Sequence, residues 1–141
     1  MHEWSIALMI LDALDELARS EGLSEVSFVE ISYGSVMELD GSLLKEALEE
    51  LSKGGPYERT EFSVVEEPTK FKCLRCGEEW SFTHELIEGD RKVLEGGMEE
   101  SSIHFIPELA PALIRCPRCH SRDFQIVSGK GIRVSRLEGS R

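Results

Sequence analysis

The spacing of apolar residues predicts two amphipathic helices in the first half of the chain. Between residues 4 and 17, apolar side chains recur at steps of three and four, which places them on one helical face. Gly22 follows as a helix stop. A second helix is predicted over residues 42–52, with Asp40 or Ser42 as the residue that caps its N-terminus.

Alternation of apolar and polar residues predicts strands after each helix, at residues 26–34 and 60–67. A two-stranded sheet is marginal alone, and the alternating segment 131–137 can return to complete it as a third strand. Residues 84–95 are predicted to be partly helical. Four short strands are also predicted, at residues 70–73, 79–83, 112–116 and 123–127.

Charge divides the 141-residue chain into two parts. Residues 1–68 contain 16 acidic and 4 basic side chains, whereas residues 69–141 contain 11 and 12, within a net charge of −11. This shift predicts two modules, of which the acidic one argues against a nucleic-acid partner. No stretch of about 18 apolar residues appears and the first residues do not resemble a signal peptide, so we expect a cytoplasmic protein without a membrane span.

All four cysteines fall in two Cys-x-x-Cys pairs, Cys73 with Cys76 and Cys116 with Cys119. This spacing lets both sulfurs of one turn face the same ion, and two such turns supply the four thiolates of a structural Zn²⁺ site. The gap of 39 residues between the pairs predicts an insertion. Basic side chains that can compensate the thiolate charge flank both pairs: Lys72, Arg75, Arg115, Arg118 and Arg122.

Other uses of four cysteines fit less well. Disulfides are rare in a cytosolic chain, and neither pair has the βαβ context of a thioredoxin-like site. An iron–sulfur cluster also uses four cysteines, but apolar shielding is thin here. His120 directly follows Cys119, and it either lies beside a thiolate, is merely exposed, or exchanges into the zinc site.

These patterns predict an α+β fold. We expect a small mixed three-stranded sheet with two helices, and an inserted β-rich, zinc-ribbon-like domain. The predicted boundaries are residues 1–68 and 128–141 for the first domain. Residues 69–127 form the zinc domain, which includes the insertion at about residues 84–111.

The first residues offer a second type of metal site. The α-amino group of Met1, the amide and imidazole of His2, and the amide or carboxylate of Glu3 lie within chelate reach of one ion. Deprotonated nitrogen donors of this kind suit Ni²⁺ or Cu²⁺ rather than Zn²⁺. On composition alone, however, a histidine at the second position is more often incidental.

Several motifs together resemble the HypA/HybF family of hydrogenase nickel-incorporation proteins over essentially the whole chain. These motifs are the Met-His-Glu start, the Cys-x-x-Cys and Cys-Pro-x-Cys-His-Ser pairs, the order of elements before them, and the Gly-x-Gly-Ile-x-Val segment after them. The resemblance implies a nickel metallochaperone, not an enzyme, that delivers Ni²⁺ for [NiFe]-hydrogenase maturation. It implies nickel at Met1, His2 and Glu3, and zinc at the four cysteines.

The resemblance also implies partners. These are the nucleotide-hydrolysing protein HypB and the large subunit of [NiFe]-hydrogenase, and some relatives also serve urease. No nucleic acid or membrane is expected as a partner, and the chain is expected to be a monomer or a dimer.

The long gap between the cysteine pairs resembles the insertion of archaeal members of this family. It contains His104, our candidate for one further nickel donor, with Asp40 as the alternative oxygen donor and helix capping as the other role of Asp40. A zinc-ribbon interaction module without a nickel role is the competing function. A hydrolytic zinc enzyme is disfavoured, because four thiolates leave no coordination position for water.

Overall fold

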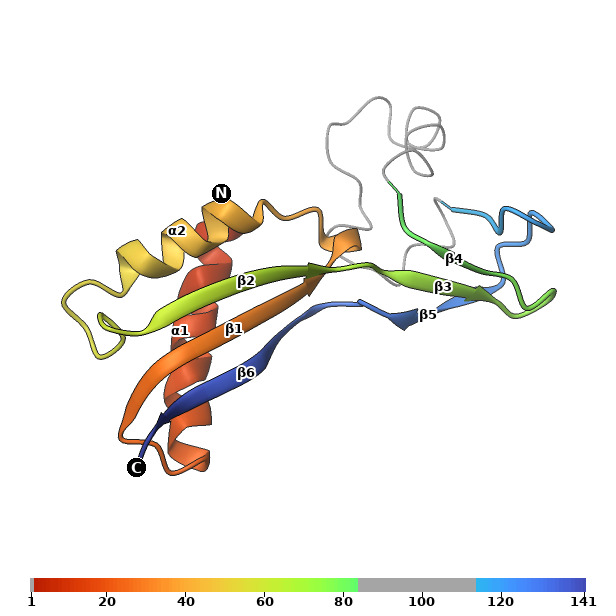
Figure 1. Cartoon of the computed structure of the whole chain (residues 1–141). Coiled ribbons are helices and arrows are strands. Elements are labelled where there is room, and N and C mark those ends of the chain that lie inside the picture. The colour runs from red at the N-terminus through yellow and green to blue at the C-terminus, as the bar shows by residue number, and fades with distance from the viewer. Residues whose placement is uncertain (1, 84–113) are drawn as a thin grey trace. The chain divides into compact units, whose positions relative to one another are not determined.

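The protein is described by a computed structural model over residues 2–83 and 114–141, with only the backbone of His2 included (Figure 1). The predicted α+β class is confirmed. In chain order the elements are α1 (His2–Ser20), β1 (Glu25–Gly34), a 3-10 turn (Ser35–Met37), α2 (Gly41–Leu51), β2 (Glu61–Glu67), β3 (Lys70–Cys73), β4 (Glu79–Ser81), β5 (Phe124–Ser128) and β6 (Ile132–Ser140).

The strands form two three-stranded sheets, ordered β2-β1-β6 and β4-β3-β5. In the first sheet, β1 and β2 run in the same direction and β6 runs in the opposite one, so the sheet is mixed as predicted (Figure 1). The last strand therefore does return as the third strand. It extends to Ser140, beyond the predicted 131–137.

The face that α1 presents to the core only partly matches the one that apolar spacing predicts, in which Ile10 and Leu14 are buried as expected. Trp4 is 37% exposed and Met9 is 70% exposed, whereas the Glu3 side chain is 8% exposed. The prediction counted only apolar residues, so it missed a carboxylate on the inner face. The buried positions of α1 are Glu3, Ala7, Ile10, Leu14 and Ala18.

Local residues explain where α1 ends and where α2 begins. Gly22 adopts a positive φ of 71°, just after α1 ends. Asp40 is the N-cap of α2, because its carboxylate accepts a hydrogen bond of 3.1 Å from the Leu43 N–H. The buried residues of α2 lie on one face, and α2 contacts α1; they are Leu44, Ala47 and Leu48.

The short strands of the second sheet differ in part from expectation. Strand β3 matches the predicted range 70–73, and β4 is shorter than predicted, at Glu79–Ser81. The strand predicted at 112–116 is wrong for its described part, since residues 114–116 are not in a strand. The buried Ile114 side chain packs into the core of the second sheet. The turn that carries Cys116 and Cys119 begins two residues later. The predicted helical segment 84–95 lies outside the described residues.

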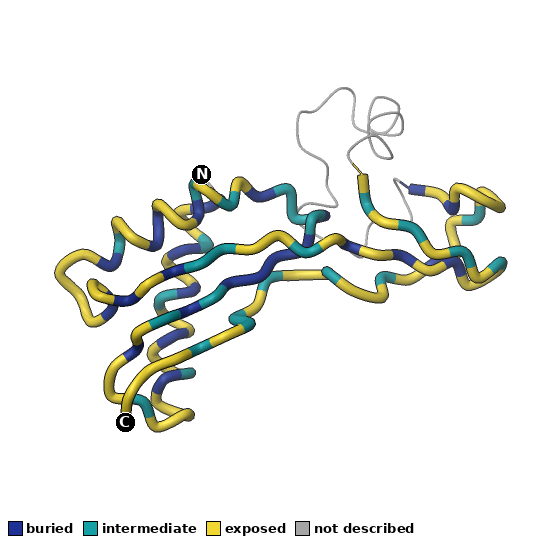
Figure 2. Tube along the Cα trace, viewed as in Figure 1, coloured by how far each residue is buried: buried dark blue, intermediate teal, exposed yellow. Residues whose placement is uncertain are grey.

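Contacts group the chain into two compact units. The first contains residues 1–32, 39–66 and 133–141, and the second contains residues 33–38 and 67–132. Burial is concentrated along β1 and on the inner sides of the helices (Figure 2). The assignment of a nickel role and a zinc role to separate domains remains a prediction.

Thr69 links several segments of the second unit. It is fully buried, its Oγ1 donates to the Gly129 carbonyl at 2.5 Å, and the same oxygen accepts from the Val36 N–H at 3.0 Å. Its own N–H donates to the Ser35 hydroxyl, and its carbonyl accepts from the Phe82 N–H. One residue thus satisfies polar groups from segments before β3, after β4 and after β5.

Replacement of Thr69 by Val should lower the free energy of unfolding of the second unit by about 3 kcal/mol, because it leaves a buried N–H and a buried carbonyl without partners. Urea unfolding followed by Trp80 fluorescence in a Trp4→Phe background measures this change. Thr83→Val, at an exposed position, is the matched control. Equal effects of the two substitutions would show that the Thr69 hydrogen bonds contribute no stability.

Candidate metal centre

The structure brings the four predicted cysteines together. One potential ligand atom from each residue lies within 4.8 Å of the others. The sulfurs of Cys73 and Cys119 are 3.6 Å apart, as are those of Cys76 and Cys116. Within the described residues, this is the one group of cysteine, histidine and acidic side chains that could hold a metal ion.

The two cysteine turns have the same backbone geometry. In each, the N–H of the first cysteine donates to the carbonyl five residues later, at 2.8 Å for Cys73 and 2.9 Å for Cys116. The carbonyl of each first cysteine accepts from the residue four positions later, which is Gly77 in one turn and His120 in the other. Both turns are therefore closed by short-range hydrogen bonds that point the sulfurs inward.

Backbone amides also support the sulfurs directly. The N–H groups of Arg75 and Cys76 each lie 3.4 Å from the Cys73 sulfur, and the Arg118 N–H lies 3.4 Å from the Cys116 sulfur. Amide donors of this kind stabilise a thiolate over a thiol. The turns are thus suited to hold negative charge on sulfur.

Because the four sulfurs lie close together, the four thiols cannot all ionise without a cation between them. The Cys76 N–H is the chief cause that lowers the pKa of Cys73, to about 6, against the opposing effect of burial. The Glu78 N–H lowers the pKa of Cys76, but burial and hydrogen bonds with the other three cysteines raise it, to about 12. The pKa of Cys119 is also raised, chiefly by burial and by its hydrogen bond with Cys73, against the Ser121 N–H. A divalent cation would remove this conflict.

A compact aromatic cluster supports the cysteine turns. Phe71 on β3 and Phe124 on β5 have ring centroids 5.3 Å apart, and Trp80 lies 5.5 and 5.2 Å from them. Cys73 ends β3 and is paired with Phe124 in the antiparallel register of β3 and β5. The cluster thus fixes the two chain segments that carry the cysteines.

Three of the five predicted basic side chains line a hollow beside the sulfurs. A surface hollow of about 710 Å³ beside Cys76 and Cys119 is lined by arginines and by His120; the arginines are Arg75, Arg115 and Arg122. Four thiolates around one divalent ion carry a net charge of −2, which these cations offset. All three arginine side chains are exposed, so their positive charge is also accessible to solvent.

His120 has a backbone role that sequence spacing did not reveal. Its φ is 63°, and the equivalent residue of the first turn, Gly77, has φ 79°. A left-handed backbone is uncommon for a residue other than glycine. Alignment of the two Cys-x-x-Cys turns by residue would have indicated it, because His120 occupies the glycine position.

The first turn of α1 contains the described part of the predicted nickel site. Glu3 is buried, and its Oε2 accepts a hydrogen bond of 2.9 Å from the Asp40 N–H. Burial raises the pKa of Glu3, but the backbone N–H groups of Asp40 and Glu3 lower it, and the net direction is downward. Glu3 is therefore a carboxylate that connects the first turn of α1 to the cap of α2.

Other predicted nickel donors lie outside what the structure describes. Met1 and His104 are outside the described residues, and the His2 side chain is not described. The roles of these residues as nickel ligands stay predictions. For Asp40, the capping role is confirmed and the nickel role is not tested.

The geometry first defines a class of protein. The protein has a candidate metal site of four cysteines on two short turns, and four protein ligands are typical of structural sites, whereas catalytic zinc sites have three and keep a position open for water. The described helices include none that is long and apolar enough to cross a bilayer.

Comparison with known proteins then shows the family. Residues 1–139 match the family model described as "Hydrogenase/urease nickel incorporation, metallochaperone, hypA", so the chain belongs to the HypA family. The hydrogenase maturation factor HypA of Pyrococcus horikoshii is 37% identical over 138 residues, covering 98% of this chain and 95% of that protein. The protein of the same name from Pyrococcus furiosus is 36% identical over 135 residues, covering 96% and 93%.

Solved structures agree with the fold. The solution structure of the Ni metallochaperone HypA from Helicobacter pylori matches with a TM-score of 0.60 at 19% identity, covering 98% of this chain and 97% of that one. A second structure, described as the solution structure of HypA protein, matches with a TM-score of 0.57 at 18% identity and covers 99% and 96%. At these identities the likeness supports the fold alone.

Binding of a divalent ion to the four cysteines should weaken steeply as pH falls. The ion must displace at least the protons of Cys76 and Cys119, whose pKa values are raised. Each displaced proton lowers the apparent affinity about tenfold per pH unit. Below about pH 6, where Cys73 is also protonated, the slope should increase further.

Competition between the protein and a chromogenic chelator for Zn²⁺ measures this slope. The Cys119→Ser variant is the comparison, because it removes one of the ligands and one of the protons. An affinity that does not change with pH above neutrality would contradict the proposed proton displacement.

Proposed function

We propose that this protein is a nickel metallochaperone that binds Ni²⁺ at its first residues and delivers it for [NiFe]-hydrogenase maturation, while Zn²⁺ occupies the four-cysteine site. The observation that carries the nickel site is the buried Glu3 carboxylate, which holds the first turn of α1 against Asp40. The donors of Met1 and His2 directly precede Glu3, so this hydrogen bond attaches them to the folded unit. Membership of the HypA family supports the same function.

Helix geometry makes backbone nitrogen available at this position. The first four N–H groups of an α-helix have no partner within the helix, and α1 begins at His2. The amides of His2 and Glu3 can therefore lose a proton to nickel without breaking a hydrogen bond between main-chain groups of the helix. With the Met1 amine and the His2 imidazole, they form a planar nitrogen-rich set that suits Ni²⁺.

The two sites separate the two metals by donor chemistry. Four soft thiolates suit Zn²⁺, and nitrogen donors in a plane reward Ni²⁺. The excess of carboxylates over residues 1–68 also attracts cations to the first unit. No residue in this function has to act as an acid, base or nucleophile, so the chain works as a carrier and not as an enzyme.

Release of nickel requires the loss of one or more donors to a recipient. Amine, amide and imidazole must all be deprotonated to bind, so a fall in pH or a competing ligand favours release. We infer that the recipients are the nucleotide-hydrolysing protein HypB and the hydrogenase large subunit. The family description also names urease, which we infer to be a further recipient of nickel from this site.

Nickel titration of untagged, zinc-loaded protein tests the ligand set. His2→Ala, or a two-residue extension before Met1, should weaken Ni²⁺ binding by at least about a hundredfold, because each removes a donor of the chelate. Both changes should leave zinc content and the circular dichroism spectrum unchanged. The same two-residue extension after Arg141 is the matched control.

The same titration identifies the remaining donor. His104→Ala should weaken nickel binding if this histidine completes the site, whereas Asp40→Asn retains the helix cap and removes only a carboxylate donor. Stoichiometric nickel binding that survives His2→Ala would overturn the assignment. In that case a zinc-ribbon interaction module becomes the better description of the chain.

Substitutions of Glu3 separate anchoring from ligation. Glu3→Gln keeps an oxygen that can accept from the Asp40 N–H, and Glu3→Ala removes it. If the carboxylate acts as an anchor only, Gln should bind nickel within about threefold of the parent, and Ala should lose tenfold or more and about 1–2 kcal/mol of stability. Equal loss of nickel affinity in Gln and Ala, with stability retained in Gln, would instead make the carboxylate a ligand.

A further inference from the structure

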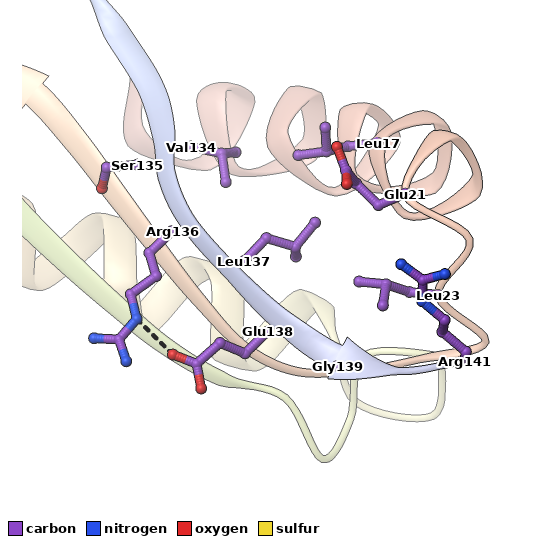
Figure 3. Close-up of a pocket in the computed structure, with 10 residues that line it drawn as sticks. All are labelled: Leu17, Glu21, Leu23, Val134, Ser135, Arg136, Leu137, Glu138, Gly139 and Arg141. Carbon is purple, nitrogen blue, oxygen red and sulfur yellow. Dashed lines mark ion pairs between the residues drawn. The ribbon is translucent and has the colours of Figure 1, made fainter.

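Two surface hollows of similar volume differ in the charges that line them. The groove beside β6, of about 680 Å³, is lined by both acidic and basic side chains. Figure 3 shows Glu138 paired with Arg136 there, so part of this charge is already neutralised. The hollow of about 710 Å³ beside Cys76 and Cys119 is lined, among the described residues, by three arginines and no carboxylate. We call it the arginine hollow; its arginines are Arg75, Arg115 and Arg122.

The two cysteine turns have the same arrangement of basic residues. In each turn a basic residue precedes the first cysteine, and an arginine precedes the second. These residues are Lys72 and Arg75 in the first turn, and Arg115 and Arg118 in the second. Residues 68–77 and 114–122 together contain six basic residues and none of the chain's 27 acidic ones. Because four thiolates around one divalent ion carry a net charge of −2, these cations exceed what the metal centre needs for compensation.

The guanidinium groups of the arginine hollow are accessible to an outside ligand. The side chains of Arg75 and Arg115 are exposed, and within the described part of the chain no ion pair joins either of them to a carboxylate. The backbone beside each arginine is nevertheless held by hydrogen bonds. The Leu74 N–H donates to the Asp123 carbonyl at 2.8 Å, and the Cys116 N–H donates to a carbonyl of its own turn at 2.9 Å. The two positive groups are therefore attached to an ordered backbone.

Exposed apolar side chains adjoin these arginines. Leu74 is 56% exposed and directly precedes Arg75, and Pro117 is exposed at the equivalent position of the second turn. Arginine is enriched in protein interfaces, and the buried centre of an interface is more apolar than the rest of the surface. A small phosphate ligand would use the guanidinium groups but would gain nothing from Leu74. The combination therefore favours a segment of protein as the occupant.

We propose that the arginine hollow and Leu74 together form a docking surface for an acidic segment of a partner protein, with carboxylates on both sides of an apolar side chain. Guanidinium groups bind carboxylates through two parallel hydrogen bonds, which fixes the orientation of the segment. The net charge of −11 repels an acidic segment from the rest of the chain, so docking is restricted to this surface. The surface goes beyond the proposed nickel function, since it uses none of the nickel donors.

Amide NMR titrations of the full, zinc-loaded chain with two blocked pentapeptides test the proposal. One peptide has four glutamates around a central leucine, and the other has glycine in place of the leucine. We expect the leucine peptide to shift the signals of Leu74, Arg75 and residues 119–122, and to bind about fivefold more tightly than the glycine peptide. Arg75→Gln with Arg115→Gln should weaken both peptides about tenfold or more, because two charge-assisted contacts are lost. Leu74→Ala should abolish the difference between the peptides.

Matched controls separate this surface from general charge effects and from a phosphate site. Arg19→Gln with Lys53→Gln makes the same change in net charge at exposed positions of the first unit, and it should leave both affinities within about twofold of the parent. Zinc content should not change in any variant, because the substituted side chains are exposed. Absence of binding by the parent chain, equal weakening by the control variant, or shifts confined to other residues would overturn the proposal. Equal binding of the two peptides would also overturn it, and tighter binding of tripolyphosphate would then assign a phosphate site.

Discussion

Four sulfur atoms within 4.8 Å of one another constrain the second unit more than any other feature. They come from chain segments separated by 39 residues, and they cannot all carry charge without a cation between them. The antiparallel pairing of β3 with β5, the aromatic cluster beneath it and the amide donors on the turns all hold these sulfurs in place. In the proposed function, zinc binding and folding of this unit are therefore coupled.

In the proposed function, the first unit has to position nickel donors without burying them. A carboxylate on the inner face of α1 connects to the backbone at the cap of α2, so the start of α1 is attached to the rest of the unit by a hydrogen bond rather than by apolar packing alone. In the proposed function, the residues before this bond bind and release nickel, and the four cysteines hold zinc.

Local patterns in the sequence predicted much of this arrangement. The cysteine spacing predicted the cluster of four sulfurs, and alternation predicted the mixed sheet with its returning last strand. Apolar periodicity over residues 4–17 did not predict that Glu3 is buried, because burial of this carboxylate depends on a partner N–H from Asp40. That partner is 37 residues away and is not visible to a local pattern. The left-handed backbone of His120 likewise depends on closure of the whole turn.

The proposed function requires two metals in two sites of different donor chemistry. X-ray absorption at the zinc and nickel edges of one sample, loaded with both metals, tests it most directly. We expect zinc with four sulfur neighbours at about 2.3 Å and nickel with nitrogen and oxygen neighbours only. Sulfur in the nickel shell, or a nickel spectrum unchanged when His2 is replaced by Ala, would contradict it.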